Sequence, residues 1–115
     1  MNFLNENHEI RFNELLSRSE RKDNEHQALF YILSAFEDTY KAADSVYNFT
    51  NECIRPTCIK RLDLDYDSHI ELIKLGFNLY NPVNKCNLCK ILNFCGKIER
   101  MVAVEAIQLR WGIIL

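Results

Sequence analysis

Five cysteines are the residues of this sequence with the clearest chemical potential. Cys53 and Cys58 form one close pair, Cys86 and Cys89 form a second pair, and Cys95 follows. Two such pairs of thiolates can hold a structural zinc ion in tetrahedral geometry. No glycine tightens the turn from Cys86 to Cys89, however, and an unpaired cytosolic cysteine usually packs as a small buried hydrophobic residue. We therefore predict free thiols and no cofactor. The alternative is a small structural-zinc protein with Cys53, Cys58, Cys86 and Cys89 as ligands.

No recognisable catalytic motif accompanies the cysteines. A nucleophilic cysteine needs a nearby general base, for which His8, His26 and His69 are the candidates, but none of them lies in a nucleophile motif. A histidine in a polar helix turn is also more often solvated than catalytic. The sequence lacks a glycine-rich phosphate loop, a His-Glu-x-x-His motif and a Gly-x-Ser-x-Gly motif. We therefore predict that the protein is not an enzyme.

Three alternating aspartates, Asp63, Asp65 and Asp67, imitate the start of a calcium-binding EF-hand loop. Such a loop needs glycine at its sixth position, where the chain bends, and a bidentate glutamate at its twelfth position. The sequence places Ser68 and Lys74 there instead. The pattern therefore does not predict a calcium site.

The same acidic segment is the predicted partner-binding site, and its residues are Asp63, Asp65, Asp67 and Glu71. Exposed carboxylates can contact a basic protein surface or take the place of nucleic-acid phosphates. The alternative is an ordinary solvated turn.

The charges are unevenly distributed along the chain, although the net charge is only −2. Acidic residues dominate the first half, whereas the C-terminal third is basic and includes Lys85, Lys90, Lys97 and Arg100. A regulator that binds nucleic acid through these four residues is an alternative function. We do not expect direct nucleic-acid binding, because a nucleic-acid-binding domain usually carries a dense basic patch.

Gly76 lies between apolar residues and could mark the turn of a helix–turn–helix motif. Pro82 would then fall inside the recognition helix, where it would remove a hydrogen bond and clash with the preceding turn. We therefore expect Gly76 to permit close packing between helices instead.

The elements that must position these residues are mostly helical. Apolar residues make up 48% of the 115-residue chain, and with only 3 Gly and 2 Pro the sequence favours long regular elements over loops. Apolar spacing and capping residues predict six helices, over residues 6–18, 25–37, 39–47, 68–80, 87–94 and 97–111. The most apolar of them, with Ala28–Phe36, should lie at the centre.

The capping residues and the connections carry further expectations. Thr39 is expected to cap the third helix, and Ser68 with Glu71 should form a capping box at the start of the fourth. The connection over 51–67 is irregular, and its alternating segment near 60–66 is either a short extended stretch or an acidic loop. The last helix should bury an apolar stripe that consists of Ile98, Met101, Val102, Ala106 and Leu109.

The predicted fold is mainly α: a compact single-domain bundle of five or six helices over residues 1–115, with the short extended segment as an option. No apolar run is long enough to span a membrane, and the N-terminus has no signal-peptide pattern. We therefore expect a cytoplasmic protein that does not contact membranes. The apolar tail Gly112–Leu115 is expected to pack into the core or to serve self-association.

Two stretches carry a family resemblance, Gln27–Tyr40 and Lys74–Asn81. They resemble a family of small uncharacterised proteins of Gram-positive bacteria, their phages and their mobile elements. The resemblance implies a compact protein that binds a host protein in a fixed ratio and blocks it. The expected function is therefore a non-enzymatic protein-binding module, an inhibitor of a bacterial defence system in the manner of anti-CRISPR proteins. Its expected partner is a host protein that binds nucleic acid.

Overall fold

The first two helices begin at residues that cap them. In the computed structural model, which describes residues 1–113, α1 spans Glu6–Arg18 and α2 spans Asn24–Ala35. The Asn5 carboxamide accepts a hydrogen bond from the His8 backbone N–H, and the Asp23 carboxylate accepts one from the His26 backbone N–H. These bonds satisfy N–H groups that have no partner inside a helix. Helix α1 has the predicted bounds, whereas α2 begins one residue before its predicted start and ends two residues before its predicted end.

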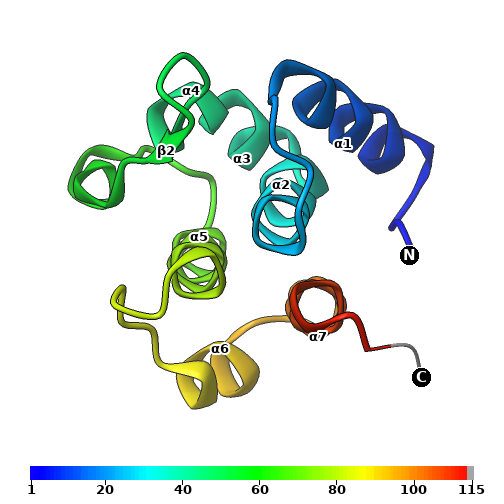
Figure 1. The fold of residues 1–115 in the computed structure, drawn as a ribbon. Helices are drawn as coiled ribbons and strands as arrows, with labels where there is room; N and C mark the ends of the chain where they lie inside the picture. The colour runs from blue at the N-terminus through cyan, green and yellow to red at the C-terminus, as the bar shows by residue number, and fades with distance from the viewer. Residues whose placement is uncertain (114–115) are drawn as a thin grey trace.

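Helix α2 is the centre of the fold. Every residue from Ala28 to Ala35 is buried, and α1, α5 (Asp67–Tyr80) and α7 (Lys97–Trp111) pack around it. Figure 1 shows α5 and α7 end-on beside α2, with α1 on the opposite side. A helix that is apolar on nearly all sides is stable only when other helices surround it.

Gly76 permits the close contact between α5 and α2. A Cβ atom at this position would lie 2.9 Å from Cδ1 of Leu29, a fully buried side chain. Helix α5 continues through Gly76 without a turn, so no helix–turn–helix motif forms here. The expectation of close helix packing at this glycine is confirmed.

Two short helices replace the predicted helix over 39–47. Helix α3 spans Glu37–Lys41 and α4 spans Ala43–Val46, so Thr39 lies inside α3 and is not a cap. The buried Thr39 hydroxyl donates to the carbonyl oxygens of Leu33 and Phe36, at 2.9 and 3.0 Å. The prediction of a Thr39 cap is wrong because this hydroxyl donates to carbonyl groups at the end of α2 and does not accept from an N–H group of the next helix.

A small sheet, which begins before the predicted connection, and a 3₁₀ helix follow α4. Strand β1 (Tyr47–Asn48) pairs antiparallel with β2 (Cys53–Ile54), and the 3₁₀ helix η1 spans Pro56–Arg61. The extended option near 60–66 is wrong. Residues 60 and 61 end η1, residues 62–66 form no strand, and the paired strands lie earlier in the chain.

Helix α5 begins one residue before the predicted cap. Asp67 is its first residue and Tyr66 is its N-cap, without a capping hydrogen bond from a side chain. The prediction of a capping box with Ser68 is therefore wrong. The predicted end at Tyr80 is confirmed, because Asn81 takes an extended conformation before Pro82.

The last two helices also match local sequence signals. Helix α6 spans Leu88–Phe94, and its cap Asn87 accepts a hydrogen bond from the Lys90 backbone N–H at 3.0 Å. Helix α7 ends at Gly112, whose φ of +66° lies in the left-handed region that glycine favours. Residues 114 and 115 of the predicted apolar tail lie outside the described residues.

The predicted buried stripe of α7 is partly wrong. Val102 and Ala106 are buried as expected, but Ile98 is 46% exposed and Met101 is 50% exposed. Ala103 is buried in their place. The helix is turned so that its smallest residues face α2, which allows the two helices to approach closely.

The observed fold confirms a mainly α, compact single domain. Within residues 1–113, no helix has both the length and the apolar composition needed to cross a membrane.

Candidate functional site

The predicted acidic site is divided between two hollows of the surface. Asp63 and Asp65, in the segment between η1 and α5, line a hollow of about 280 Å³ together with Glu37, Asp38 and Lys41 of α3. Four of the five lining residues are acidic, and Nζ of Lys41 lies 3.0 Å from the Glu37 carboxylate, so the hollow keeps an excess of negative charge. The sequence missed the contribution of α3, because Glu37 and Asp38 are distant in the chain and lie next to Asp63 only after folding.

Asp38 holds the acidic hollow together. Its carboxylate accepts hydrogen bonds from the backbone N–H groups of Thr39 and Asp65, at 2.8 and 3.0 Å. It also accepts one from Nδ1 of His69, at 2.7 Å. These bonds join α3, the segment before α5 and α5 itself. Asp38 therefore positions Asp65, one of the exposed aspartates.

Asp67 and Glu71 belong to the second hollow, of about 340 Å³, which also contains Lys90 and Cys95. Nζ of Lys90 lies 3.1 Å from the Glu71 carboxylate, and Nζ of Lys74 lies 3.4 Å from it. These pairs largely neutralise Glu71. In contrast, none of the ion pairs within residues 1–113 involves Asp63, Asp65 or Asp67.

The five cysteines are reduced and lie in different environments. Cys58 and Cys95 are buried, Cys86 is half-buried, and Cys53 and Cys89 are exposed. Burial raises the pKa of the Cys58, Cys86 and Cys95 thiols, which keeps them protonated and unreactive. In the part of the chain that the structure describes, no three His, Cys, Asp or Glu side chains group together as metal ligands. The structure therefore does not bring together Cys53, Cys58, Cys86 and Cys89.

All three histidines are buried, contrary to the sequence-based expectation of solvated side chains. His26 joins a chain of hydrogen bonds from α2 to the turn of the small sheet. Its Nδ1 lies 2.5 Å from the Asp23 carboxylate, and its Nε2 lies 3.0 Å from the Tyr47 hydroxyl, which donates to the Glu52 carboxylate. These bonds connect the start of α2 to β1 and to the turn that follows it.

The Glu52 carboxylate also fixes the loop before α2. It accepts hydrogen bonds from the Glu20 backbone N–H at 2.7 Å and from the Ser19 hydroxyl at 2.9 Å. Burial alone would raise the pKa of Glu52, but the bonds from Tyr47, Glu20 and Ser19 together lower it. Glu52 has a positive φ of 54°, which is uncommon for a residue other than glycine. This backbone conformation aims its side chain at the loop.

His69 ties α5 to α3 and α7. Besides its bond to Asp38, its Nε2 lies 3.7 Å from the Glu99 carboxylate of α7, and its ring stacks on Phe36 with a centroid distance of 4.1 Å. The ring is only 4% exposed. No nucleophilic side chain is bonded to it within the described residues. His69 therefore has a structural role in positioning Asp38.

His8 lies in the core as a neutral side chain. Its Nδ1 accepts a hydrogen bond from the Leu4 backbone N–H at 3.1 Å, and its Nε2–H donates to the Tyr31 carbonyl at 2.9 Å. Protonation would place a hydrogen on Nδ1, directly facing the Leu4 N–H. Desolvation by burial, with a smaller contribution from Arg11, lowers the pKa of His8, although the Tyr31 bond opposes this.

We expect His8 to make the protein less stable in mild acid. As the pH falls below about 6.5, the unfolded chain binds a proton at His8 while the folded protein does not. The free energy of unfolding should therefore decrease from about pH 6.5 down to the lower pKa of the folded state. Urea unfolding over this pH range measures how steeply the free energy of unfolding changes with pH. The variant His8→Gln should lose the contribution of His8 to this pH dependence. An unchanged slope in His8→Gln would contradict the assignment.

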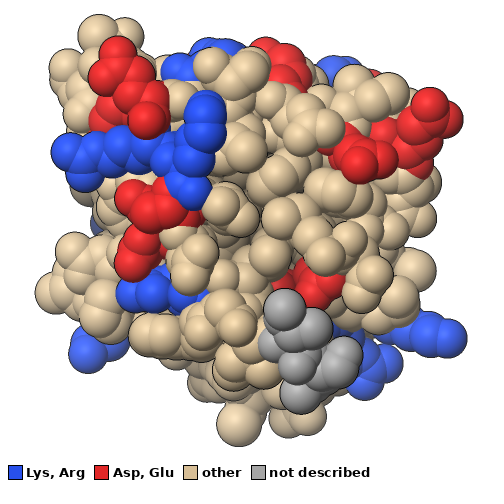
Figure 2. All heavy atoms as spheres, turned by 45° about the vertical axis from the view of Figure 1, so that its right-hand side comes forward, with Lys and Arg blue, Asp and Glu red and all other residues tan. Residues whose placement is uncertain are grey.

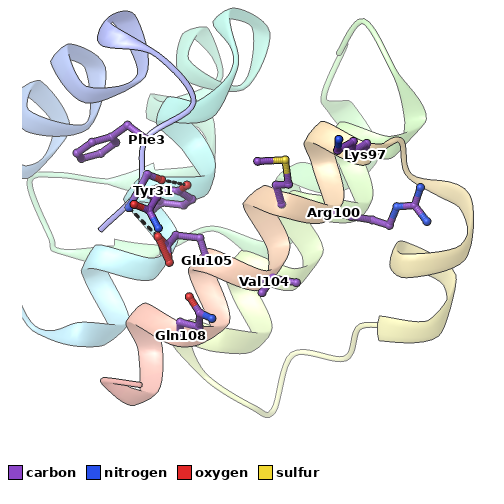
Figure 3. A pocket seen from close by; sticks show the side chains of 9 residues that line it. Phe3, Tyr31, Lys97, Arg100, Val104, Glu105 and Gln108 are labelled. Carbon is purple, nitrogen blue, oxygen red and sulfur yellow. Dashed lines mark hydrogen bonds between the residues drawn. The ribbon is translucent and has the colours of Figure 1, made fainter. Parts of the chain in front are cut away.

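A third feature is an apolar groove of about 400 Å³ along the outer side of α7. Phe3 of the N-terminal segment and Met101 and Val104 of α7 line it. Lys97 and Arg100 lie at one end of the groove, as Figure 3 shows. Of the four basic residues predicted for nucleic-acid binding, these two line the groove, while Lys90 pairs with Glu71 and Lys85 lies in the connection before α6.

Comparison with known proteins assigns a family but no activity. A family of unknown function, DUF6075, matches residues 1–113. The chain belongs to this family. No curated protein and no solved structure gives a significant match. The match covers both stretches on which the sequence resemblance was based, Gln27–Tyr40 and Lys74–Asn81.

Proposed function

We propose that this member of DUF6075 is a non-enzymatic protein-binding module whose acidic surface binds a basic surface of its partner. The acidic surface consists of Glu37, Asp63 and Asp65, which line the first hollow, and of Asp67 at the start of α5. The half-buried Asp38 bonds to the Asp65 backbone N–H. The observation that supports it best is the hollow in which carboxylates of α3 and of the segment before α5 lie together.

Two further observations favour binding over catalysis. Asp63, Asp65 and Asp67 are exposed and make no ion pair within residues 1–113, so their charges remain available to a partner. The histidines, which would be the candidate general bases, are buried and bonded to structural groups. Electrostatic complementarity of this kind mainly increases the rate of association and the specificity of a complex.

The proposed partner is a protein that binds nucleic acid, because such a protein presents a basic surface to phosphates. Carboxylates spaced along a rigid surface can occupy that site in place of the phosphates. On the basis of the sequence resemblance, we propose that the protein comes from a phage or mobile element and inhibits a bacterial defence nuclease such as a CRISPR–Cas effector. This proposal also requires a cytoplasmic location.

An affinity capture experiment tests the proposal. Tagged wild-type protein is incubated with a nuclease-treated lysate of a Gram-positive bacterium that carries CRISPR–Cas, and the captured proteins are quantified by mass spectrometry. We expect capture of a basic, nucleic-acid-binding protein. The variant Asp63→Asn/Asp65→Asn/Asp67→Asn should capture at least about tenfold less of it.

A matched control variant, Glu6→Gln/Glu9→Gln/Glu20→Gln, removes three exposed carboxylates outside the acidic surface and should capture as much as the wild type. Equal loss in both variants would show that only net charge matters, which contradicts a specific site. Retardation of duplex DNA by the purified protein, with a steep salt dependence, would favour a nucleic-acid-binding function instead.

A further inference from the structure

The outer side of α7 exposes large apolar side chains in a regular stripe. Ile98, Met101 and Val104 follow one another at three-residue intervals and are 46%, 50% and 46% exposed. Trp111, two turns further along the helix, is 60% exposed. A contiguous apolar patch on a water-soluble domain usually marks an interaction surface.

The N-terminal segment forms a fixed wall beside this stripe. The backbone N–H of Asn2 donates to the Glu105 carboxylate at 2.6 Å, and the Asn2 carbonyl accepts from the Tyr31 hydroxyl at 2.5 Å. Phe3 packs in turn on Phe12 and Tyr31. Figure 3 shows the two hydrogen bonds as dashed lines, with Phe3 beside Tyr31. The groove is therefore preformed, and binding there does not require the segment to become ordered.

The charged residues that border the stripe are positive toward one end of α7 and negative toward the other. Lys97 and Arg100 lie toward the N-terminal end of α7, and Glu105 lies toward its C-terminal end, with Met101 and Val104 between them. Lys97 and Glu105 are eight residues apart, which is about 12 Å along a helix. Figure 2 shows the side of the molecule on which the termini lie, where most charged groups lie near the edges and the middle is mostly uncharged apart from an acidic group near its lower centre.

We propose that the α7 stripe is covered by the α7 stripe of a second copy of this chain, in an antiparallel arrangement about a twofold axis near Met101. A twofold axis at Met101 that makes the two helices antiparallel places residue 97 of one copy opposite residue 105 of the other, because both lie four residues from Met101. Each Lys97 then faces the Glu105 of the second copy, and this happens twice in the dimer. The stripe from Ile98 to Val104 is buried between the two ion pairs.

The charges exclude the opposite arrangement. If the two α7 helices were parallel, Lys97 and Arg100 would face the same residues of the second copy, and Glu105 would face Glu105. Like charges opposed across an interface cost several kcal/mol. The charge pattern of α7 is thus complementary to itself in one orientation only. This proposal does not use the acidic surface, so it stands or falls separately from the proposed function.

The molar mass of the purified full chain over a range of concentrations tests the proposal. We expect analytical ultracentrifugation to show a monomer–dimer equilibrium that shifts toward the dimer as the concentration rises. The variant Met101→Glu, which places a charge near the axis, should be monomeric throughout. Its control, Val83→Glu, changes a 72% exposed residue outside the stripe and should dimerise as the wild type does. Circular dichroism verifies that both variants fold.

A charge exchange tests the antiparallel register. Lys97→Glu alone and Glu105→Lys alone each place like charges in opposition, so each should weaken the dimer by at least about tenfold. The double variant Lys97→Glu/Glu105→Lys restores opposite charges and should recover dimerisation to within about threefold of the wild type. Because Glu105→Lys also removes the bond to Asn2, the recovery in the double variant is the decisive measurement.

Two results would overturn the proposal. A wild-type chain that stays monomeric at all concentrations would show that α7 faces solvent or another protein. A dimer whose stability is the same in both single variants and the double variant would show a different interface.

Discussion

Replacing Asp38 with alanine should lower the free energy of unfolding by about 1 to 3 kcal/mol, because the change leaves the buried His69 ring and the buried Thr39 without a hydrogen-bond partner. The His69 ring is 4% exposed and would lose its Nδ1 partner at 2.7 Å. The backbone N–H groups of Thr39 and Asp65 would lose their bonds as well. Urea unfolding monitored by circular dichroism measures the change.

Asp63 provides the matched control for Asp38. It is an exposed aspartate that lines the same hollow, and it makes no ion pair within residues 1–113. Asp63→Ala should therefore change the free energy of unfolding by no more than about 0.5 kcal/mol. Equal effects of the two variants would contradict the positioning role of Asp38. Asp38→Asn, which keeps one acceptor oxygen, should fall between the two.

The second large effect is expected at Phe30. Its side chain is fully buried in α2, stacks on Phe49 at a centroid distance of 5.6 Å, and meets the edge of Tyr47 at 5.3 Å. Truncation to alanine removes a large apolar side chain and leaves a cavity, at a cost of about 3 to 5 kcal/mol. The midpoint of urea unfolding should fall accordingly, and binding of xenon or another small apolar molecule would detect the cavity.

The control for Phe30→Ala is Ile10→Ala. Ile10 is an apolar helical residue of α1, but it is 57% exposed. Its truncation removes little buried surface, and alanine favours the helix, so the free energy of unfolding should change by less than about 0.5 kcal/mol. A comparable loss in both variants would argue against α2 as the centre of the core.

The sequence did not distinguish among the four acidic residues of the predicted site. The sequence directed attention to Asp63, Asp65, Asp67 and Glu71 as one cluster. The structure gives Glu71 two lysine partners, bonds Asp65 to Asp38 of α3, and places Asp63 in the same hollow. Charge spacing along a chain does not reveal which carboxylates will find a partner, because the partners come from other elements.

The local features of this protein were determined by its sequence. The exact bounds of α1 and α7, the Asp23 and Asn87 caps and the end of α5 before Pro82 all follow from interactions within a few residues. Such interactions are the same wherever the helix lies in the fold. The central place of α2 also follows, since its apolar surface must be surrounded.

Only the tertiary structure decided which polar residues are buried and which apolar residues are exposed. His8, His26 and His69 enter the core because distant groups, Tyr31, Tyr47 and Asp38, complete their hydrogen bonds. Ile98 and Met101 remain exposed because the small residues Ala103 and Ala106 allow α7 to approach α2 on its other side. Both outcomes depend on contacts between elements far apart in the chain, which no local pattern records.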